Sequence, residues 1–141
     1  MRLSQQKPCL SKENISSTQI IVQDLQRHGY TGDIKEHLNK ILDCVNNKKG
    51  VLVRFSNTVF FGALVEPCVF SVHLYTIDSP RALAGAINAA IDIAKYSDIK
   101  KLCASTKEYK IIKMLIRMGY PIEVQQHGDT FSWSMEIKSE I

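Results

Sequence analysis

The sequence contains no apolar run that reaches the roughly 18 residues needed to span a membrane as a helix. Its N-terminal stretch, MRLSQQKPCLSKENISS, has no apolar segment of the kind that a secretory signal peptide carries. These two absences argue against a membrane-anchored or secreted protein. We therefore expect a cytoplasmic location and no membrane partner.

An excess of charge of one sign is also missing. Lysine and arginine number 18 and the acidic residues 14, which gives a net charge of +4 over 141 residues. The two signs are interspersed, so the balance supports only weak attraction to polyanions, and we expect no nucleic-acid partner. The hydrophobic content of 45% is ordinary for a globular protein of one domain.

Several chemical motifs are absent as well. The four cysteines, Cys9, Cys44, Cys68 and Cys103, have no CxxC spacing, and three of them lie in apolar segments. This favours reduced core cysteines over a disulfide framework. The cysteines and the four histidines show no metal-ligand spacing, so no metal site is predicted. A G-x-S-x-G nucleophile motif and a P-loop are also lacking.

What is present is a regular succession of helix and strand signals. Residues 1–15 are polar and aperiodic and predict a flexible N-terminal arm, whereas residues 16–141 read as one domain without repeats. A first helix begins at an S-x-x-Q capping box at Ser16. A second begins at Asp33 and carries an apolar stripe, spaced for one helix face, that ends at Val45.

Three strands joined by short connections follow the helices. They are predicted at residues 51–55, 58–65 and 68–76. Connections this short predict an antiparallel meander. In the third strand, alternation places Ser71, His73 and Tyr75 on one face and the apolar residues on the other.

The centre of the sequence predicts a βαβ unit. Ser79 caps a helix that has Pro80 at its first position and small residues along its apolar stripe, which should let it approach the sheet closely. A short apolar strand, 102–104, comes next, and Thr106 is the predicted cap of a last helix. Strand, helix, strand in this order joins two parallel strands through a right-handed crossover. Ligands usually bind beyond the carboxyl end of such a strand.

A hairpin ends the chain. Residues 121–126 and 130–137 are predicted to pair, and the second strand alternates cleanly, with Trp133 on its apolar face. The predicted fold class is therefore α/β, with a mixed, mostly antiparallel sheet, a central parallel βαβ pair and helices on both faces.

This order of elements resembles the GNAT family of acetyl-coenzyme A-dependent N-acyltransferases. The most specific part is KKLCASTKEYKIIKMLIRMGYPIEV, which is similar to the family's closing strand–helix–strand segment, with Gly119 and Tyr120 at its Gly-aromatic pair. A first strand of the family pattern is not evident before residue 16. The resemblance implies a GNAT-like fold, acetyl-coenzyme A as the cofactor, and an acyl-coenzyme A and an amine as substrates.

The resemblance also implies a coenzyme-binding segment. In the family, a loop reading Arg/Gln-x-x-Gly-x-Gly/Ala holds the coenzyme A pyrophosphate with its amides at a helix N-terminus. The matching run here is Arg81, Ala82, Leu83, Ala84, Gly85 and Ala86. It agrees at Arg81 and Ala86, but alanine stands at position 84, where the family has glycine. A positive φ at Ala84 would be strained, and Pro80 removes one amide donor.

Cations near this segment have two interpretations each. Arg81 either pairs with a phosphate, which its guanidinium fork matches, or is an exposed residue in the unfavourable half of the helix dipole. Lys110, Lys113 and Arg117 are helically spaced. They either meet a coenzyme phosphate or an acidic partner, or form a solvated face.

Three residues are candidates for the chemistry. If the face that His73 and Tyr75 share lines an acceptor site, His73 is a candidate general base near neutral pH, with Tyr75 as a second catalytic candidate. The alternative is a hydrogen-bonded histidine between sheet and helix. Glu66, which precedes Pro67 at a strand end, is another candidate base, or else a solvated loop carboxylate.

Two departures from the family pattern bear on activity. Glu108 stands where the family often has asparagine, and Leu115 stands where many members carry the tyrosine that protonates the departing thiolate. The segment VHLYTIDSPRALAGAI is moreover similar to small GNAT-like proteins of tailed phages, some of which are virion components.

Two functions follow from these comparisons. One is a catalytically silent binding or structural protein, such as a phage virion component, with a protein partner or a homo-oligomer and a location in the virion. The other is an active acetyl-coenzyme A-dependent N-acetyltransferase acting on an amine. The altered phosphate segment and Leu115 favour the first.

Overall fold

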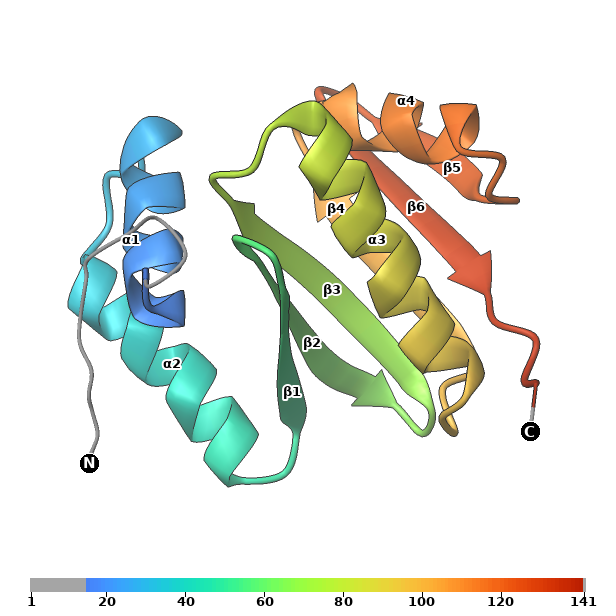
Figure 1. Ribbon diagram of the computed structural model, residues 1–141, viewed down its shortest axis with the longest axis horizontal. Helices are drawn as coiled ribbons and strands as arrows, with labels where there is room; N and C mark the ends of the chain where they lie inside the picture. The colour runs from blue at the N-terminus through green and yellow to red at the C-terminus, as the bar shows by residue number, and fades with distance from the viewer. Residues whose placement is uncertain (1–14, 141) are drawn as a thin grey trace, which may run out of the picture.

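Residues 15–140, the part of the chain that the computed structural model describes, form four helices and a six-stranded sheet (Figure 1). The elements are α1 (Ser17–Arg27), α2 (Ile34–Asn46), β1 (Gly50–Phe55), β2 (Thr58–Glu66), β3 (Val69–Thr76), α3 (Pro80–Lys95), β4 (Lys101–Thr106), α4 (Lys110–Arg117), β5 (Glu123–His127) and β6 (Thr130–Glu136). The strand order across the sheet is β1-β2-β3-β4-β6-β5. This is the predicted mixed α/β fold.

The first two helices begin where the capping residues predict. The Ser16 side chain accepts from the Gln19 amide at 3.1 Å, and the Gln19 side chain accepts from the Ser16 amide at 2.9 Å, so the capping box is formed. The Asp33 side chain likewise caps α2. Both helices cover one face of the sheet (Figure 1). Their buried residues pack with those of the strands beneath: Ile20, Ile21, Leu25, Ile41, Val59, Phe61 and Tyr75.

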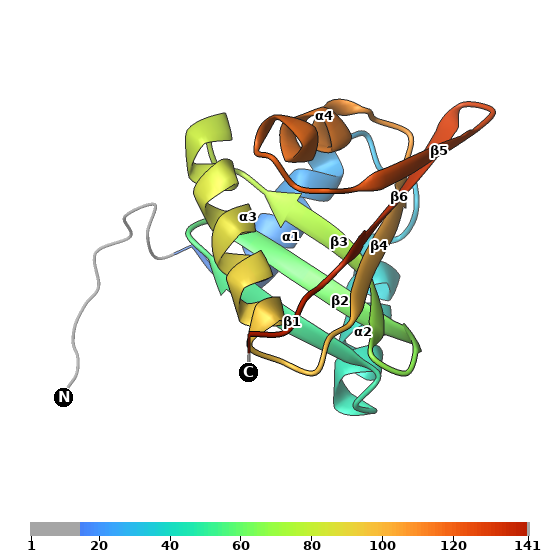
Figure 2. The same cartoon turned by 90° about the vertical axis from the view of Figure 1, so that its right-hand side faces the viewer.

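The other face of the sheet carries α3 and a larger core. Ile87 and Ile91 of α3, Ile112 and Leu115 of α4, and Trp133 of β6 are among its buried members. The predicted alternation in β6 is confirmed, because Trp133 and Met135 are buried. Figure 2 shows the β5–β6 hairpin reaching out from one edge of the sheet.

The meander and the βαβ unit are both confirmed. β1–β2 and β2–β3 are antiparallel, whereas β3 and β4 are parallel neighbours with α3 between them in sequence. The parallel contact is short: it consists of Val69↔Lys101, Phe70↔Leu102 and Ser71↔Cys103. β3 continues to Thr76 and β4 to Thr106 without further pairing to each other, so the two strands separate toward their carboxyl ends.

Some local predictions were wrong. Thr106 does not cap α4; its hydroxyl accepts from the Glu108 amide at 3.0 Å in the preceding turn, and α4 starts only at Lys110. β4 is longer than the predicted 102–104. Cys44, Cys68 and Cys103 are free thiols but only partly buried, and Cys9 lies outside the described residues. The predicted arm also lies outside them except for Ile15, which packs on the α1–α2 core.

Two features are absent from residues 15–140. Over this range no helix combines the length and the apolarity that crossing a bilayer requires. Nor do the same residues bring together three histidine, cysteine, aspartate or glutamate side chains that could hold a metal ion.

Candidate functional site

The separation of β3 and β4 opens a cleft of about 1180 Å³. Beyond the last pair, Ser71↔Cys103, side chains of α1, β3, β4 and α4 line it together with Trp133 of β6 and Pro80 at the start of α3. The cleft therefore lies at the carboxyl ends of the two parallel strands, where ligands of such sheets usually bind.

The edge of β3 that faces the cleft carries free backbone groups. At the end of β3, the Ile77 amide donates to the Asn57 carbonyl on the β2 side at 3.1 Å, whereas the Thr76 amide donates to Asp24, so even-numbered residues of this strand point their backbone groups away from β2. Alternate residues of a strand share an edge. The Val72 carbonyl and both backbone groups of Leu74, which lie beyond the last β3–β4 pair, therefore face the cleft. An extended ligand with amide groups can pair with them as an added strand would.

His73 lines the cleft from the α1 side. Its side chain is partly open to solvent, and the protein around it lowers its pKa below the usual 6.5 because burial penalises the charged imidazolium. His73 is thus neutral at pH 7 and can accept a proton. The predicted face that it shares with Tyr75 is confirmed by the packing of Tyr75 on the α1–α2 core.

Tyr75 has a structural environment instead. Its side chain is 6% exposed, and it does not line the cleft. Its hydroxyl lies 2.8 Å from Nε2 of His37 on α2, and burial is the main cause that raises its pKa to about 12. Tyr75 therefore stays protonated at neutral pH and joins α2 to the carboxyl-terminal end of β3.

Glu66 lies far from the cleft along the sheet. It ends β2 and pairs with Val69, the first residue of β3, whereas the cleft opens at the other end of β3. Its side chain is exposed. The structure therefore does not bring Glu66 together with His73, and the solvated reading of this carboxylate fits its position.

The predicted phosphate segment turns out to be helix. Arg81 through Ala86 all lie within α3, which starts at Pro80. Ser79 accepts from the Ala82 amide with its hydroxyl (3.3 Å) and from the Leu83 amide with its carbonyl (2.9 Å). Of the first four residues of α3, only Arg81 thus keeps an amide that Ser79 does not engage. The expected strain at position 84 is wrong, because Ala84 has no positive φ.

Asp78 places a carboxylate just before this helix. It accepts hydrogen bonds from the Ser56 hydroxyl at 2.9 Å, the Asn57 amide at 3.0 Å and the Thr58 hydroxyl at 2.7 Å. It also lines the cleft. Its negative charge lies at the helix end that would otherwise attract a phosphate, and so opposes phosphate binding there.

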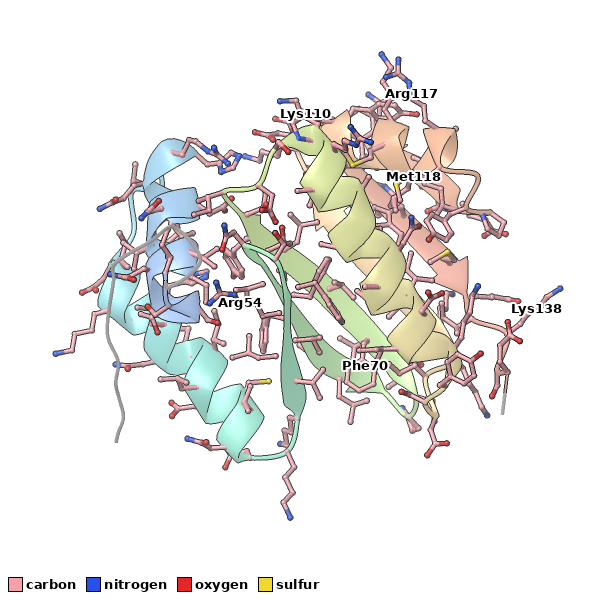
Figure 3. All side chains as sticks on the ribbon, viewed as in Figure 1. Arg54, Phe70, Lys110, Arg117, Met118 and Lys138 are labelled. Atoms are coloured by element: carbon pink, nitrogen blue, oxygen red, sulfur yellow. The ribbon has the colours of Figure 1, made fainter. Side chains whose placement is uncertain are left out.

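The cations of α4 face the cleft. Lys110, Lys113 and Arg117 all line it, and Figure 3 labels Lys110 and Arg117 on α4. Arg81 is exposed and is not among the lining residues. These three α4 cations were predicted either to contact a phosphate or acidic partner or to form a solvated face, and their position in the cleft fits contact with an anionic ligand.

Solved structures share this arrangement, although no family model and no curated protein sequence matches the chain. An aminoglycoside 6'-acetyltransferase type Ii matches with a TM-score of 0.64 and 11% identity over 94% of this chain and 97% of its own. The N-acetyltransferase PseH of Campylobacter jejuni, solved with acetyl coenzyme A, matches with a TM-score of 0.60 and 15% identity over 89% and 94%.

A third match is the ribosomal-protein-S18-alanine N-acetyltransferase of Escherichia coli, with a TM-score of 0.61 and 8% identity over 90% of this chain and 93% of its own. A further match, from Streptococcus pneumoniae, is described as an acetyltransferase of the GNAT family. The chain has the GNAT fold. Identities this low establish the fold alone, and the sequence resemblance to GNAT proteins is confirmed at that level.

The family resemblance places the thiolate-protonating tyrosine at Leu115 of α4. Leu115 is 3% exposed and packs in the core beside Trp133. The cleft side of α4 carries other residues: Lys110, Ile111, Lys113, Met114, Arg117 and Met118. None of these is a tyrosine, and the side chains among them with an N–H group are Lys110, Lys113 and Arg117.

Sequence reasoning missed the contribution of α1. Asp24 accepts from the Thr76 amide at 3.1 Å, and the Arg27 guanidinium donates to the Thr76 carbonyl at 2.7 Å. Burial raises the pKa of Asp24, which the Thr76 hydrogen bond opposes. His28 lies 3.8 Å from Glu108, so α1 also approaches the segment before α4. These contacts bound the α1 side of the cleft, and none follows a local sequence pattern.

Proposed function

We propose that this protein binds an acyl-coenzyme A thioester in the β3–β4 cleft and transfers the acyl group to an amine. The observation that carries the proposal is the separation of β3 from β4, which leaves strand-edge backbone groups in the cleft beside a neutral histidine. Two of the matching GNAT structures, PseH and a phosphinothricin acetyltransferase of Sinorhizobium meliloti, contain acetyl coenzyme A, which supports this class of ligand.

The described residues fit such a donor in part. The pantetheine arm of coenzyme A contains amides, and the free backbone groups of Val72 and Leu74 can pair with them. The α4 cations, Lys110, Lys113 and Arg117, match the negative charge of the phosphates. Asp78 does not fit, and we expect it to weaken pyrophosphate binding at the start of α3.

The acceptor enters from the α1 side in this proposal. Asp24 and Glu108 line that part of the cleft together with His73. Their carboxyl groups suit a basic group on the acceptor. His73 takes a proton from the amine nitrogen, the nitrogen attacks the thioester carbon, and the C–S bond breaks as the amide C–N bond forms. The thiolate takes up a proton from water and the His73 imidazolium gives its proton to water, which leaves an amide, the coenzyme A thiol and a neutral His73.

A second function rests on two of the observations above. Asp78 opposes phosphate at the start of α3, and Leu115 removes the usual tyrosine donor from α4. Both fit a catalytically silent GNAT-fold protein that binds a protein partner, such as a phage virion component. The virion is the proposed location of such a phage component, and the cytoplasm is the proposed location otherwise.

The test is binding and turnover measured together. Coenzyme A at a hundredfold excess over its dissociation constant should stabilise the protein by about 2.7 kcal/mol. With an acyl-coenzyme A and a panel of amines, His73→Gln should lower kcat/KM by roughly 10²-fold or more, the usual contribution of a general base. His127→Gln, the same change at an exposed position of β5, is the matched control.

The outcomes separate the two functions. Binding without turnover, in the presence of every amine tried, supports the silent protein. If His73→Gln and His127→Gln have the same kcat/KM, His73 is not the general base. If millimolar coenzyme A changes neither the melting temperature nor the amide resonances of Val72–Thr76, the acyl-transfer proposal is wrong.

A further inference from the structure

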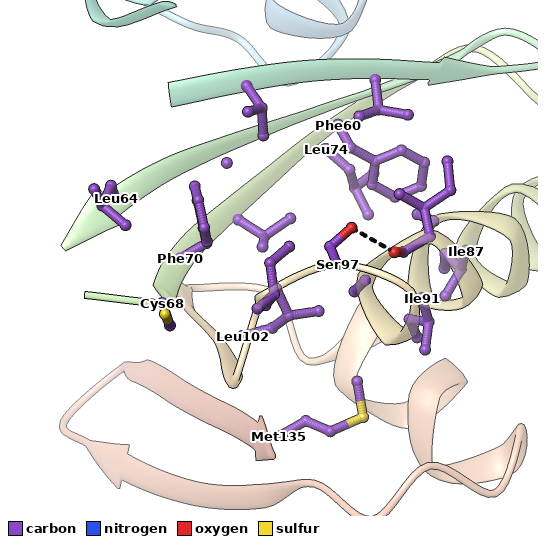
Figure 4. Close-up of a pocket in the computed structure, with 18 of the residues that line it drawn as sticks. Phe60, Leu64, Cys68, Phe70, Leu74, Ile87, Ile91, Ser97, Leu102 and Met135 are labelled. Carbon is purple, nitrogen blue, oxygen red and sulfur yellow. Dashed lines mark hydrogen bonds between the residues drawn. The ribbon is translucent and has the colours of Figure 1, made fainter. Parts of the chain in front are cut away.

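A second, separate hollow lies beneath α3. It has a volume of about 490 Å³ and is bounded by α3 on one side and by β1, β2 and β3 on the other. Figure 4 shows how apolar its lining is, with Phe60, Phe70, Leu74, Ile87 and Ile91 around it. The hollow opens to solvent on one side, so it is an apolar groove between α3 and the sheet and not a closed void.

Small residues account for the space. Ala90 and Ala94 of α3 and Gly62 of β2 line the hollow where larger side chains would fill it. The sequence suggested that the small residues of α3 bring this helix close to the sheet. The structure instead leaves volume between them. A Cβ on Gly62 would meet Phe70 and Val51 at 3.4 Å, so the backbone there tolerates a side chain that the sequence does not supply.

The lining has almost nothing to offer a polar ligand. Ser97, the hydroxyl-bearing residue in Figure 4, already donates to the Ile93 carbonyl at 2.8 Å. Asp98, Cys68 and Trp133, through its indole N–H, are the other lining residues with a polar side-chain group. Buried polar groups of a ligand need partners, whereas hydrocarbon does not. The hollow thus suits a hydrocarbon chain.

The hollow and the cleft share a wall. Val72, Leu74, Ile111 and Trp133 line both. An acyl chain attached to a thioester in the cleft has to pass between these side chains to continue beneath α3. At the other end, Val51, Leu64 and Ile93 are exposed, so the hollow also opens to solvent next to β1.

We infer that the hollow receives the acyl chain of the donor, so that the substrate is an acyl-coenzyme A with a chain of several methylenes rather than acetyl-coenzyme A. This inference rests on the proposed acyl-coenzyme A site. It also resolves the poor fit at Asp78, because burial of the chain adds affinity that the phosphate end lacks.

The single tryptophan of the chain gives a direct readout. Because Trp133 lines both spaces, its fluorescence reports occupancy of either. We would titrate the protein with coenzyme A and with its acetyl, butyryl, octanoyl and dodecanoyl thioesters. Affinity should rise about fourfold per added methylene, the equivalent of about 0.8 kcal/mol for each buried methylene, until the hollow is full.

Two variants should abolish this dependence. Ala90→Leu fills the hollow from α3, and Gly62→Ala narrows it from β2 with one methyl group. Ala90→Leu should bind octanoyl-coenzyme A at least tenfold more weakly than the parent, and Gly62→Ala about fourfold more weakly, while both leave the affinity for coenzyme A unchanged. Ala89→Leu is the control, because it introduces a leucine on the same helix but outside the hollow. Its affinities for coenzyme A and the four thioesters should match those of the parent. Circular dichroism verifies that each variant is folded.

Each result decides the inference. A steep series that both cavity variants flatten supports it. Equal affinity for coenzyme A and all four thioesters overturns it but leaves the proposed function standing. No binding of any thioester overturns both. If affinity rises steeply with chain length but does so equally in Ala90→Leu and Gly62→Ala, the chain binds elsewhere and the inference is wrong.

Discussion

Asp78→Asn is predicted to lower stability and raise affinity for coenzyme A at the same time. The carboxylate can only accept, so the Thr58 hydroxyl must donate to it. In the 2.7 Å contact between the two threonine hydroxyls, Thr76 must then donate to Thr58, while Thr76 accepts from the Asp78 amide. Thr58 is 0% exposed and Thr76 is 8% exposed. Asp78 thus ends a closed chain of hydrogen bonds that joins the β1–β2 turn to the start of α3.

The two effects have different sizes. A hydrogen bond to a charged group contributes about 1.5–3 kcal/mol, and three such bonds end on this half-buried carboxylate. Asparagine keeps one acceptor oxygen, so we expect a loss of about 2 kcal/mol in the free energy of unfolding. Removing one like charge near the phosphate site is worth about 1 kcal/mol at high dielectric, roughly a fivefold gain in coenzyme A affinity.

Urea denaturation and calorimetric titration with coenzyme A measure the two effects. Asp43→Asn, the same change on the exposed side of α2, is the control and should alter neither. A variant as stable as the parent would show that the hydrogen bonds of Asp78 contribute little. Unchanged or weaker coenzyme A binding would show that the phosphates do not approach the start of α3.

Three further predictions concern stability. Trp133→Ala should cost about 3–5 kcal/mol, as large aromatic truncations in a core do, and an unchanged urea midpoint would contradict the packing of β6. Below about pH 6.5 the free energy of unfolding should fall as the pH falls. Burial lowers the pKa values of His37 and His73 in the folded state, so the unfolded state binds more protons there. Urea titrations at several pH values should show a weaker pH dependence of this free energy in His73→Gln. Gly85→Ala places a Cβ in mid-α3 with no neighbouring atom within 4 Å and should raise the free energy of unfolding by about 0.4–1 kcal/mol. Gly119→Ala, at φ +89°, should lower it by about 1–2 kcal/mol. Equal changes in melting temperature for the two variants would contradict both backbone assignments.

The sequence predicted those parts of the fold that local patterns determine. The capping box at Ser16, the alternation through Trp133 and the βαβ order are signals carried by neighbouring residues, and the structure contains all three. The predicted helix cap at Thr106 was wrong because its hydroxyl caps a turn instead of a helix. Local patterns cannot distinguish these two uses of a threonine.

The candidate site was predicted less well. His73 and the α4 cations were found because their spacing fixes the face on which they lie. Asp78 and Asp24 were missed because their partners come from other elements, 20 and 52 residues away along the chain. Glu66 was proposed for its place at a strand end, but the antiparallel return of β2 carries that end away from the cleft.

The short contact between β3 and β4 also has a mechanical consequence. On one side of it, β2 and β3 pack with α1 and α2 in one core; on the other, β4, β5 and β6 form a continuous ladder with one another. Only three residue pairs of the described sheet join these two halves. What else holds the halves together is side-chain packing in the larger core, which contains Phe60 of β2 and Trp133 of β6. A change that widens the mouth between β3 and α4 would therefore strain this packing before it broke a ladder within either half.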